Sequence, residues 1–185
     1  TYVPVPKEGI VKVSDIMQAV RDDTTLVAVM YANNEIGPIQ PIHEIALALK
    51  ERRAEKKNAP CFFTDACQAS GALSLKVDDL GVDLMAISSS KIYGPKAVGC
   101  LYLRKGIVLE AQMVGGGQER NIRSGTENAA LIIGLGEALS IADDMREGES
   151  ERLTQLRDFM MQEVVKIPGV TINGHNTKRL PKNVH

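Results

Sequence analysis

Tryptophan is absent from the sequence, and the other aromatic residues are few, with three Phe and four Tyr. Binding of single-stranded nucleic acid usually depends on aromatic side chains on which bases stack, so the sequence argues against that function. An excess of positive charge is also missing, because 22 Lys and Arg stand against 23 Asp and Glu and the net charge is −1. We therefore expect no nucleic-acid partner.

Long hydrophobic runs are missing as well. No run reaches the roughly 18 to 20 apolar residues that a membrane helix needs, and the first residues do not have the pattern of a secretory signal peptide. We therefore expect no membrane partner and a cytoplasmic location. The hydrophobic content of 44% and the charged content of 24% are typical of a folded globular domain, and they argue against a disordered, collagen-like or coiled-coil chain.

Cysteine is scarce, with Cys61, Cys67 and Cys100 as the whole set. Their spacing does not match a zinc site, and three cysteines are too few for a disulfide scaffold. We expect each of them to be a small buried hydrophobic residue, and we expect no metal site.

Segments with helix and strand patterns alternate along the chain. Helices are predicted at residues 14–21, 42–57, 129–145 and 149–166, and strands at 25–30, 61–64, 82–87, 97–103 and 170–172. This alternation predicts an α/β fold with a mainly parallel sheet. The strand at 97–103 is expected to run antiparallel to its neighbour, because the Gly94-Pro95 connection is too short for a crossover helix. The charged stretch 143–151 is the predicted domain boundary.

Three polar clusters follow predicted strands: Asn33-Asn34, Asp65, and Ser88 to Lys91. Ligands of α/β sheets bind at the carboxyl ends of the strands, so we expect these clusters to meet there. Lys91 fits a Schiff-base lysine that holds pyridoxal 5′-phosphate, and the alternative is a surface lysine in a polar turn. Asp65 could keep the pyridine nitrogen of that cofactor protonated. Gln68 could reach the phenolic oxygen of the ring, or it could be an exposed amide.

Four segments carry a resemblance to a known family. Tyr31-Ala-Asn-Asn-Glu-Ile-Gly37, Thr64-Asp-Ala-Cys-Gln68, Ser90-Lys-Ile-Tyr-Gly-Pro-Lys96 and the glycine-rich stretch 115–128 closely resemble the cysteine desulfurase and selenocysteine lyase family, in that family's order. The resemblance implies a class V aminotransferase-like enzyme of pyridoxal phosphate fold type I. Residues 1–145 would then be part of its large cofactor-binding domain, and residues 146–185 would begin a smaller α+β C-terminal domain.

The resemblance also implies roles for individual residues. Lys91 would carry the cofactor and move protons on the substrate, Asp65 would hold the pyridine nitrogen, and Gln68 would hold the ring oxygen. Asn34 would lie beside the cofactor and the substrate carboxylate.

Three further residues would bind the cofactor phosphate. Ser88 would bind it directly, and Ser90, which stands where the family often has histidine, could still donate a hydrogen bond to it. Thr126 would reach the phosphate of the partner subunit, which implies a homodimer.

The implied activity is the conversion of L-cysteine to L-alanine, with sulfur held as an enzyme persulfide and passed to an acceptor scaffold protein for iron–sulfur cluster assembly or thiolation. Members of the family are longer than this chain, and none of the three cysteines matches their nucleophile. We therefore expect the isolated 185 residues to be inactive. Selenocysteine lyase, another class V enzyme and a non-catalytic fragment or dimerisation module stay open as alternatives.

Overall fold

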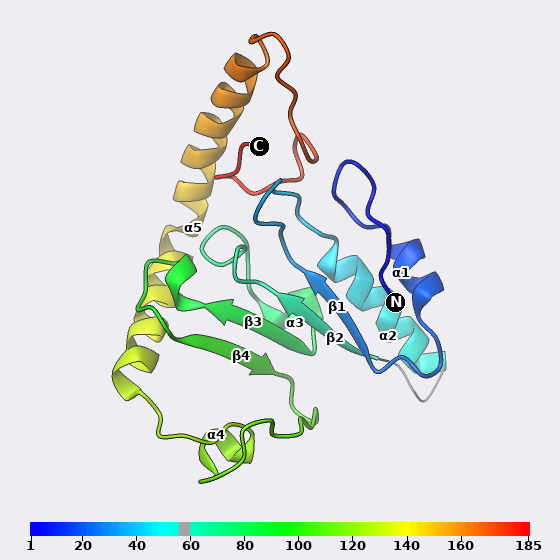
Figure 1. The fold of residues 1–185 in the computed structure, drawn as a ribbon, viewed down its shortest axis with the longest axis vertical. Coiled ribbons are helices and arrows are strands. Elements are labelled where there is room, and N and C mark those ends of the chain that lie inside the picture. Colours follow the sequence, from blue (N-terminus) through cyan, green and yellow to red (C-terminus); the bar gives the residue numbers. More distant parts are fainter. Residues whose placement is uncertain (56–59) are drawn as a thin grey trace.

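The computed structural model describes residues 1–55 and 60–185. Its centre is a four-stranded sheet (Figure 1) in the order β1-β2-β3-β4. The strands are β1 (Leu26–Met30), β2 (Cys61–Asp65), β3 (Leu84–Ser88) and β4 (Gly99–Leu103). The first three are parallel and β4 is antiparallel to β3, which confirms the predicted α/β fold and the direction expected from the short connection.

Helices α1 (Val13–Ala19) and α2 (Ile42–Glu55) lie side by side against the sheet (Figure 1). The α2 residues Ile42, Ile45 and Leu49 recur at helical spacing and are almost fully buried, together with Phe62 of β2. This hydrophobic core fixes the sheet beneath the two helices and so fixes where its strands end. Positions 56 and 57 of the predicted helix 42–57 lie outside the described residues.

Two short helices, α3 (Val77–Leu80) and α4 (Gln118–Asn121), precede the long helix α5 (Ala129–Val164). The prediction of two helices at 129–145 and 149–166 is wrong, because α5 runs without a break through the charged stretch. Ion pairs one turn apart, Arg146–Asp143 at 3.1 Å and Arg152–Glu149 at 2.7 Å, follow the helix through this stretch. A single helical glycine destabilises by only about 1 kcal/mol, so Gly148 does not end it. The boundary after residue 145 falls inside α5, and the division into two domains stays a prediction.

The chain after α5 folds back toward the loop that follows β1 (Figure 1). The predicted strand at 170–172 is wrong, since these residues are irregular and Val170 is 38% exposed. A strand needs a neighbour to share its backbone hydrogen bonds, and the sheet described here ends at β1 and β4. The segment is instead anchored by Leu180, which is buried against Ala32 and Ala72.

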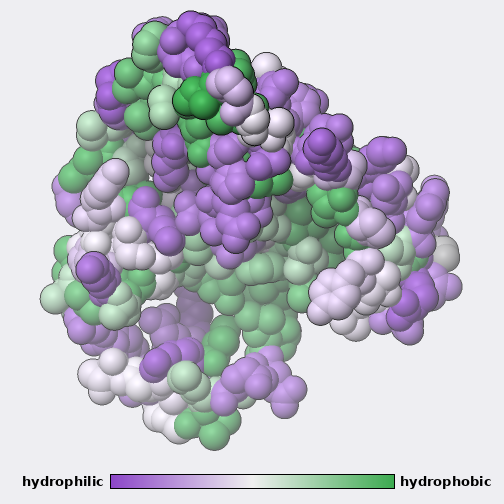
Figure 2. All heavy atoms as spheres, turned by 45° about the horizontal axis from the view of Figure 1, so that its top comes forward, coloured by the Kyte–Doolittle hydropathy of each residue, from purple (hydrophilic) through white to green (hydrophobic). Residues whose placement is uncertain are grey.

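The surface contains many large hydrophobic side chains. Among those more than half exposed are Val108 and Val114 after β4, and Ile133 and Phe159 on α5. Figure 2 shows hydrophobic residues in the recessed middle of one face, with hydrophilic residues around them. Surfaces of this kind mark interaction sites in other proteins. Among the described residues, no helix is long and apolar enough to cross a membrane.

Candidate active site

The parallel register brings three strand ends to one edge of the sheet. Met30 of β1 pairs with Asp65 of β2, and Asp65 pairs with Ala86 of β3. The pairing continues past the strands, because the N–H of Tyr31 donates to the carbonyl of Asp65 at 2.8 Å and the N–H of Ala66 donates to the carbonyl of Ala86 at 2.9 Å. The residues that follow β1, β2 and β3 therefore lie along the same edge.

Asp65 is the last residue of β2 and is partly buried. Its Oδ1 accepts a hydrogen bond from the backbone N–H of Cys67 at 2.9 Å. This turn fixes the carboxylate at the strand end. Gln68 lies in the same turn and is also partly buried, so its side chain starts close to that of Asp65.

Hydroxyl groups gather at the end of β3. The Oγ atoms of Ser88 and Ser90 are 3.1 Å apart, and the short 3₁₀ helix η1 (Ser89–Lys91) carries the chain onward. Ser89 is fully buried, and its Oγ has no hydrogen-bond partner among the described residues. Lys91 is exposed at the end of η1. The strand end thus presents an amine beside several hydroxyl groups, a donor set that suits a phosphorylated aldehyde.

Cys67 lies in the turn that follows Asp65. Partial burial and the neighbouring Asp65 carboxylate raise the pKa of the Cys67 thiol to about 11, while the positive charge of Lys91 opposes this shift. Asp65 and Lys91 are therefore both close enough to act on one thiol. The same raised pKa keeps Cys67 protonated near neutral pH, which makes it a poor nucleophile.

Asn34 lies at the tip of a loop after β1. Oδ1 of Asn33 accepts hydrogen bonds from the N–H groups of Glu35 at 3.0 Å and Ile36 at 2.9 Å, which closes a tight turn around Asn34. The N–H of Asn33 donates to the carbonyl of Pro38 at 2.9 Å. Asn34 itself is exposed at the turn.

Thr126 lies apart from the other candidate residues. It is exposed in the segment between α4 and α5, which Figure 1 shows below β4 and away from the ends of β1, β2 and β3. A role for Thr126 at the site of a partner subunit stays a prediction.

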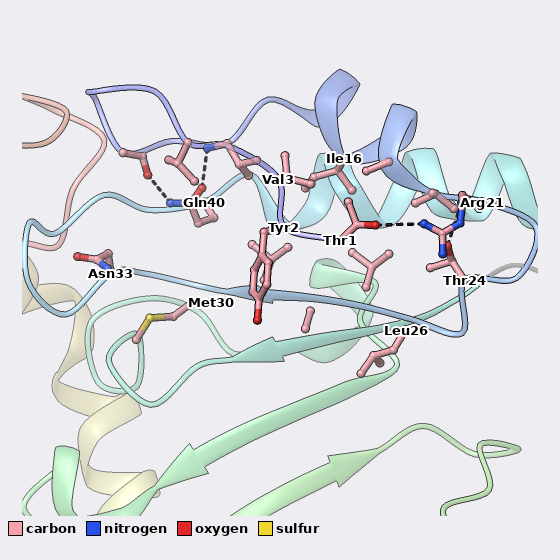
Figure 3. A pocket seen from close by; sticks show the side chains of 18 of the residues that line it. Thr1, Tyr2, Val3, Ile16, Arg21, Thr24, Leu26, Met30, Asn33 and Gln40 are labelled. Atoms are coloured by element: carbon pink, nitrogen blue, oxygen red, sulfur yellow. Dashed lines mark hydrogen bonds between the residues drawn. The ribbon is translucent and has the colours of Figure 1, made fainter.

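A larger hollow lies elsewhere, between the first residues of the chain and β1. It has a volume of about 760 Å³, and Figure 3 shows Tyr2 and Val3 on one side of it and Leu26 and Met30 of β1 on another. None of the seven candidate residues lines it. Its lining includes Arg21 and Asp23, which pair with each other at 2.9 Å just before β1 begins. The size of this hollow alone does not identify the site.

A second cavity, of about 460 Å³, adjoins the candidate residues. Its lining includes Lys91, Tyr93 and Pro95, residues of α5, and Lys182. Partial burial, and after it the charge of Lys91, lower the pKa of Lys182. The sequence analysis missed Lys182, because only the fold-back of the C-terminal segment brings it beside Lys91.

The cysteines depart from expectation. Cys61 and Cys67 are only partly buried, and the prediction of a buried residue is wrong for Cys100, which is exposed. Cys100 belongs to β4, an edge strand whose first three residues are all exposed. Among the described residues, no three His, Cys, Asp or Glu side chains cluster as a metal site would require.

Comparison with known proteins places these observations in a family context. The family model for aminotransferase class-V matches residues 1–184. A cysteine desulfurase IscS from Dictyoglomus turgidum is 48% identical over 186 residues, which are 100% of this chain and 46% of that protein. A human cysteine desulfurase is 42% identical over 98% of this chain and 39% of its own length. The chain thus spans less than half the length of these relatives.

Solved structures agree with the sequence matches. A NifS-like protein superposes with a TM-score of 0.89 at 34% identity, over 98% of this chain and 48% of its own. A NifS-like protein from Rickettsia africae superposes with a TM-score of 0.88 at 29% identity, over 97% of this chain and 49% of its own. The arrangement of the sheet and of the strand ends is therefore shared with these proteins.

Proposed function

This chain belongs to the class-V aminotransferase family, and on that basis we propose that it is part of a pyridoxal 5′-phosphate-dependent cysteine desulfurase. The proposal is supported by the relatives named cysteine desulfurase, which match all or nearly all of the chain. The observation that carries it is the parallel register of β2 and β3, which brings Asp65 at the end of one strand and Ser88 to Lys91 at the end of the other to the same edge of the sheet. One pyridine ring between them could contact both.

The residues at the strand ends fit the cofactor. Lys91 would bind its aldehyde carbon, and Asp65 would face the pyridine nitrogen with the carboxylate oxygen that is not held by Cys67. Gln68 would donate to the ring oxygen. Ser88 and Ser90, whose hydroxyls are 3.1 Å apart, would donate to the phosphate. When bound, the cofactor supplies an electron sink for the substrate's bonding electrons.

The chain's own residues would then orient the substrate and move its protons. The Lys91 amine would take the proton from Cα of L-cysteine and return it later, since an amine can serve as a general base once it is deprotonated. The Asp65 carboxylate would hold the proton on the ring nitrogen. Asn34 would donate a hydrogen bond to the substrate carboxylate.

The overall conversion transfers one sulfur atom. The Cβ–S bond of L-cysteine breaks, Cβ gains a proton, and L-alanine leaves. The sulfur would form an S–S bond with an enzyme thiol outside residues 1–185, since none of Cys61, Cys67 and Cys100 matches the nucleophile of the family. The persulfide would then pass to an acceptor scaffold protein for iron–sulfur cluster assembly or thiolation. We further propose a cytoplasmic homodimer in which Thr126 completes the site of the partner subunit.

The test uses the protein expressed from its complete gene. The wild type is expected to show the visible absorption band of lysine-bound pyridoxal phosphate and to release sulfide from cysteine. Lys91→Ala is expected to lose both, whereas Lys105→Ala, at an exposed lysine in the turn after β4, is expected to keep both. A band that persists in Lys91→Ala, or that is missing from the wild type, would overturn the proposal. Comparing cysteine with selenocysteine and cysteine sulfinate then tests the substrate preference.

A further inference from the structure

Three consecutive carbonyl groups after Asn34 are held by the C-terminal segment, defined here as residues 173–183. Nδ2 of Asn183 donates to the carbonyl of Glu35 at 2.7 Å. Nη2 of Arg179 donates to the carbonyl of Ile36 at 3.0 Å. The N–H of Leu180 donates to the carbonyl of Gly37 at 2.9 Å. The partners are more than 140 residues apart in sequence, so these bonds form only in the folded chain.

Arg179 is the centre of this contact. It is 2% exposed, and besides Ile36 it donates to Oδ1 of Asn183 at 2.9 Å and to the carbonyl of Asn173 at 3.3 Å. Burial, and after it the charge of Arg157, lower the pKa of Arg179. Burying a guanidinium that is bonded mainly to carbonyl oxygens is energetically unfavourable in itself. The protein nevertheless uses such a group to hold this particular loop.

The long helix α5 supports the same contact. Nη1 of Arg157 donates to the carbonyls of Arg179 and Leu180 at 3.3 and 3.2 Å. The backbone of the C-terminal segment is therefore fixed to α5, while its side chains and the N–H of Leu180 bond to the loop. A shift of α5 relative to the sheet would be transmitted to the turn that carries Asn34.

The loop and the C-terminal segment approach each other too closely for extra atoms. A Cβ atom at Gly37 would lie 2.5 Å from Oδ1 of Asn183, and one at Gly174 would lie 2.6 Å from the carbonyl oxygen of Ile36. Both glycines have positive φ, which also favours glycine at these positions. The loop and the C-terminal segment therefore fit together in one alignment only.

We propose that Arg179 and Asn183 are positioning residues that set the place of Asn34 in the active site. This inference rests on the proposed function, in which Asn34 contacts the substrate carboxylate. The turn formed by Asn33 fixes the local shape of the loop, and the C-terminal segment fixes where the loop stands relative to the strand ends. Because binding of a reacting group is sensitive to misplacement of about 1 Å, loosening this contact weakens the binding of cysteine.

Asn183→Asp gives the sharpest test. The aspartate keeps an oxygen that accepts from Arg179, but it loses the donor to the carbonyl of Glu35 and places a negative charge against it. In the full-length holoenzyme the KM for cysteine is expected to rise about five- to tenfold, with kcat changed by less than about twofold. The absorption band of the lysine-bound cofactor is expected to stay.

Arg179→Met removes all the guanidinium bonds and is expected to raise KM at least as much, whereas Arg179→Lys restores part of the effect. Arg152→Met is the matched control, since Arg152 is an exposed arginine on α5 that pairs with Glu149. Should Arg179→Met fail to fold, Asn183→Asp carries the test, because it removes a single donor at a partly buried position.

A second readout is independent of the cofactor. Exchange of the amide hydrogens of Glu35, Ile36, Gly37 and Ile39 in the cofactor-free protein is expected to be faster in Asn183→Asp and unchanged in Arg152→Met. A change in only one readout, exchange or KM, overturns the inference, as does no change in either. If the wild type lacks the cofactor band, the proposed function fails, and the exchange data still report whether the segment holds the loop. If the band is present and KM is unaffected, the inference alone fails.

Discussion

Oδ1 of Asp65 accepts a hydrogen bond from the backbone N–H of Cys67 at 2.9 Å. This bond fixes the carboxylate at the end of β2 and at the same time places the Cys67 thiol beside it. Lys91, at the end of β3, affects the same thiol with the opposite sign of charge. Cys67 is therefore a reporter of the two groups on which the proposed cofactor site depends.

The first prediction concerns the ionisation of Cys67. Burial and Asp65 raise its pKa to about 11, so the thiol binds its proton more tightly in the folded protein. At about pH 8 we expect its alkylation to be roughly a hundredfold slower than that of a free cysteine, since only the thiolate reacts. Asp65→Asn removes a negative charge and shifts the rate profile to lower pH, whereas Lys91→Ala removes a positive charge and shifts it to higher pH.

Iodoacetamide modification of the cofactor-free protein, followed by mass spectrometry across the pH range, measures these profiles. Asp79→Asn, at an exposed aspartate in α3, is the control and is expected to leave the profile unchanged. Equal profiles for the wild type and for Asp65→Asn would show that the carboxylate does not act on the thiol.

The second prediction concerns Lys182. Its pKa is lowered by partial burial and, to a smaller extent, by the charge of Lys91 across the shared cavity. Lys91→Ala removes that charge, so the pKa of Lys182 is expected to rise but not to reach its ordinary value, because the burial remains. NMR titration of isotope-labelled lysine side chains measures the change, with Lys105→Ala as the control. An unchanged pKa of Lys182 would mean that the charge of Lys91 does not act on it.

The strand ends were the most predictable part of the molecule. A buried strand pattern followed by Asp65, and another followed by Ser88 to Lys91, places both polar clusters at one edge once the strands are parallel. The short Gly94-Pro95 connection likewise predicts the direction of β4. Local sequence is sufficient for these features because each depends on a few adjacent residues.

Other features depend on contacts that local patterns do not contain. The charged stretch around Gly148 is compatible with a linker, but ion pairs one turn apart continue α5 through it. The place of Lys182 beside Lys91 follows from Leu180, which is buried against residues more than 100 positions earlier. Cys100 is exposed because of the position of β4 at the edge of the sheet.

The third prediction concerns stability at the other end of the strands, where Asp83 directly precedes β3. The Asp83 side chain is 3% exposed, and it accepts hydrogen bonds from the N–H of Phe62 and from Nη2 of Arg53, both at 2.9 Å. Asp83→Ala leaves these donors without their partner and is expected to lower the free energy of unfolding by about 3 kcal/mol. Urea unfolding of the full-length protein measures the difference.

Asp78→Ala is the matched control for this prediction. Asp78 pairs with Arg104 at 3.4 Å, but its side chain is 88% exposed. The expected loss is below about 1 kcal/mol, because solvent screens an exposed ion pair. Equal losses for the two variants would contradict a special contribution of Asp83.

The last prediction compares two glycines in α5. A Cβ atom at Gly134 would lie 2.5 Å from Cγ of Pro95, in the loop after Lys91, whereas a Cβ atom at Gly136 would meet nothing within 4 Å. Replacing a helical glycine by alanine stabilises by about 1 kcal/mol when the methyl group has room, so Gly136→Ala is expected to raise the free energy of unfolding by about that amount. Gly134→Ala gains the same helix propensity but forces α5 and the Pro95 loop apart, with an expected net loss of about 1 to 2 kcal/mol. Because Pro95 follows Lys91 by four residues, only Gly134→Ala is also expected to weaken the absorption band of the lysine-bound cofactor. Equal stabilisation by both substitutions would mean that α5 does not pack tightly against the lysine loop.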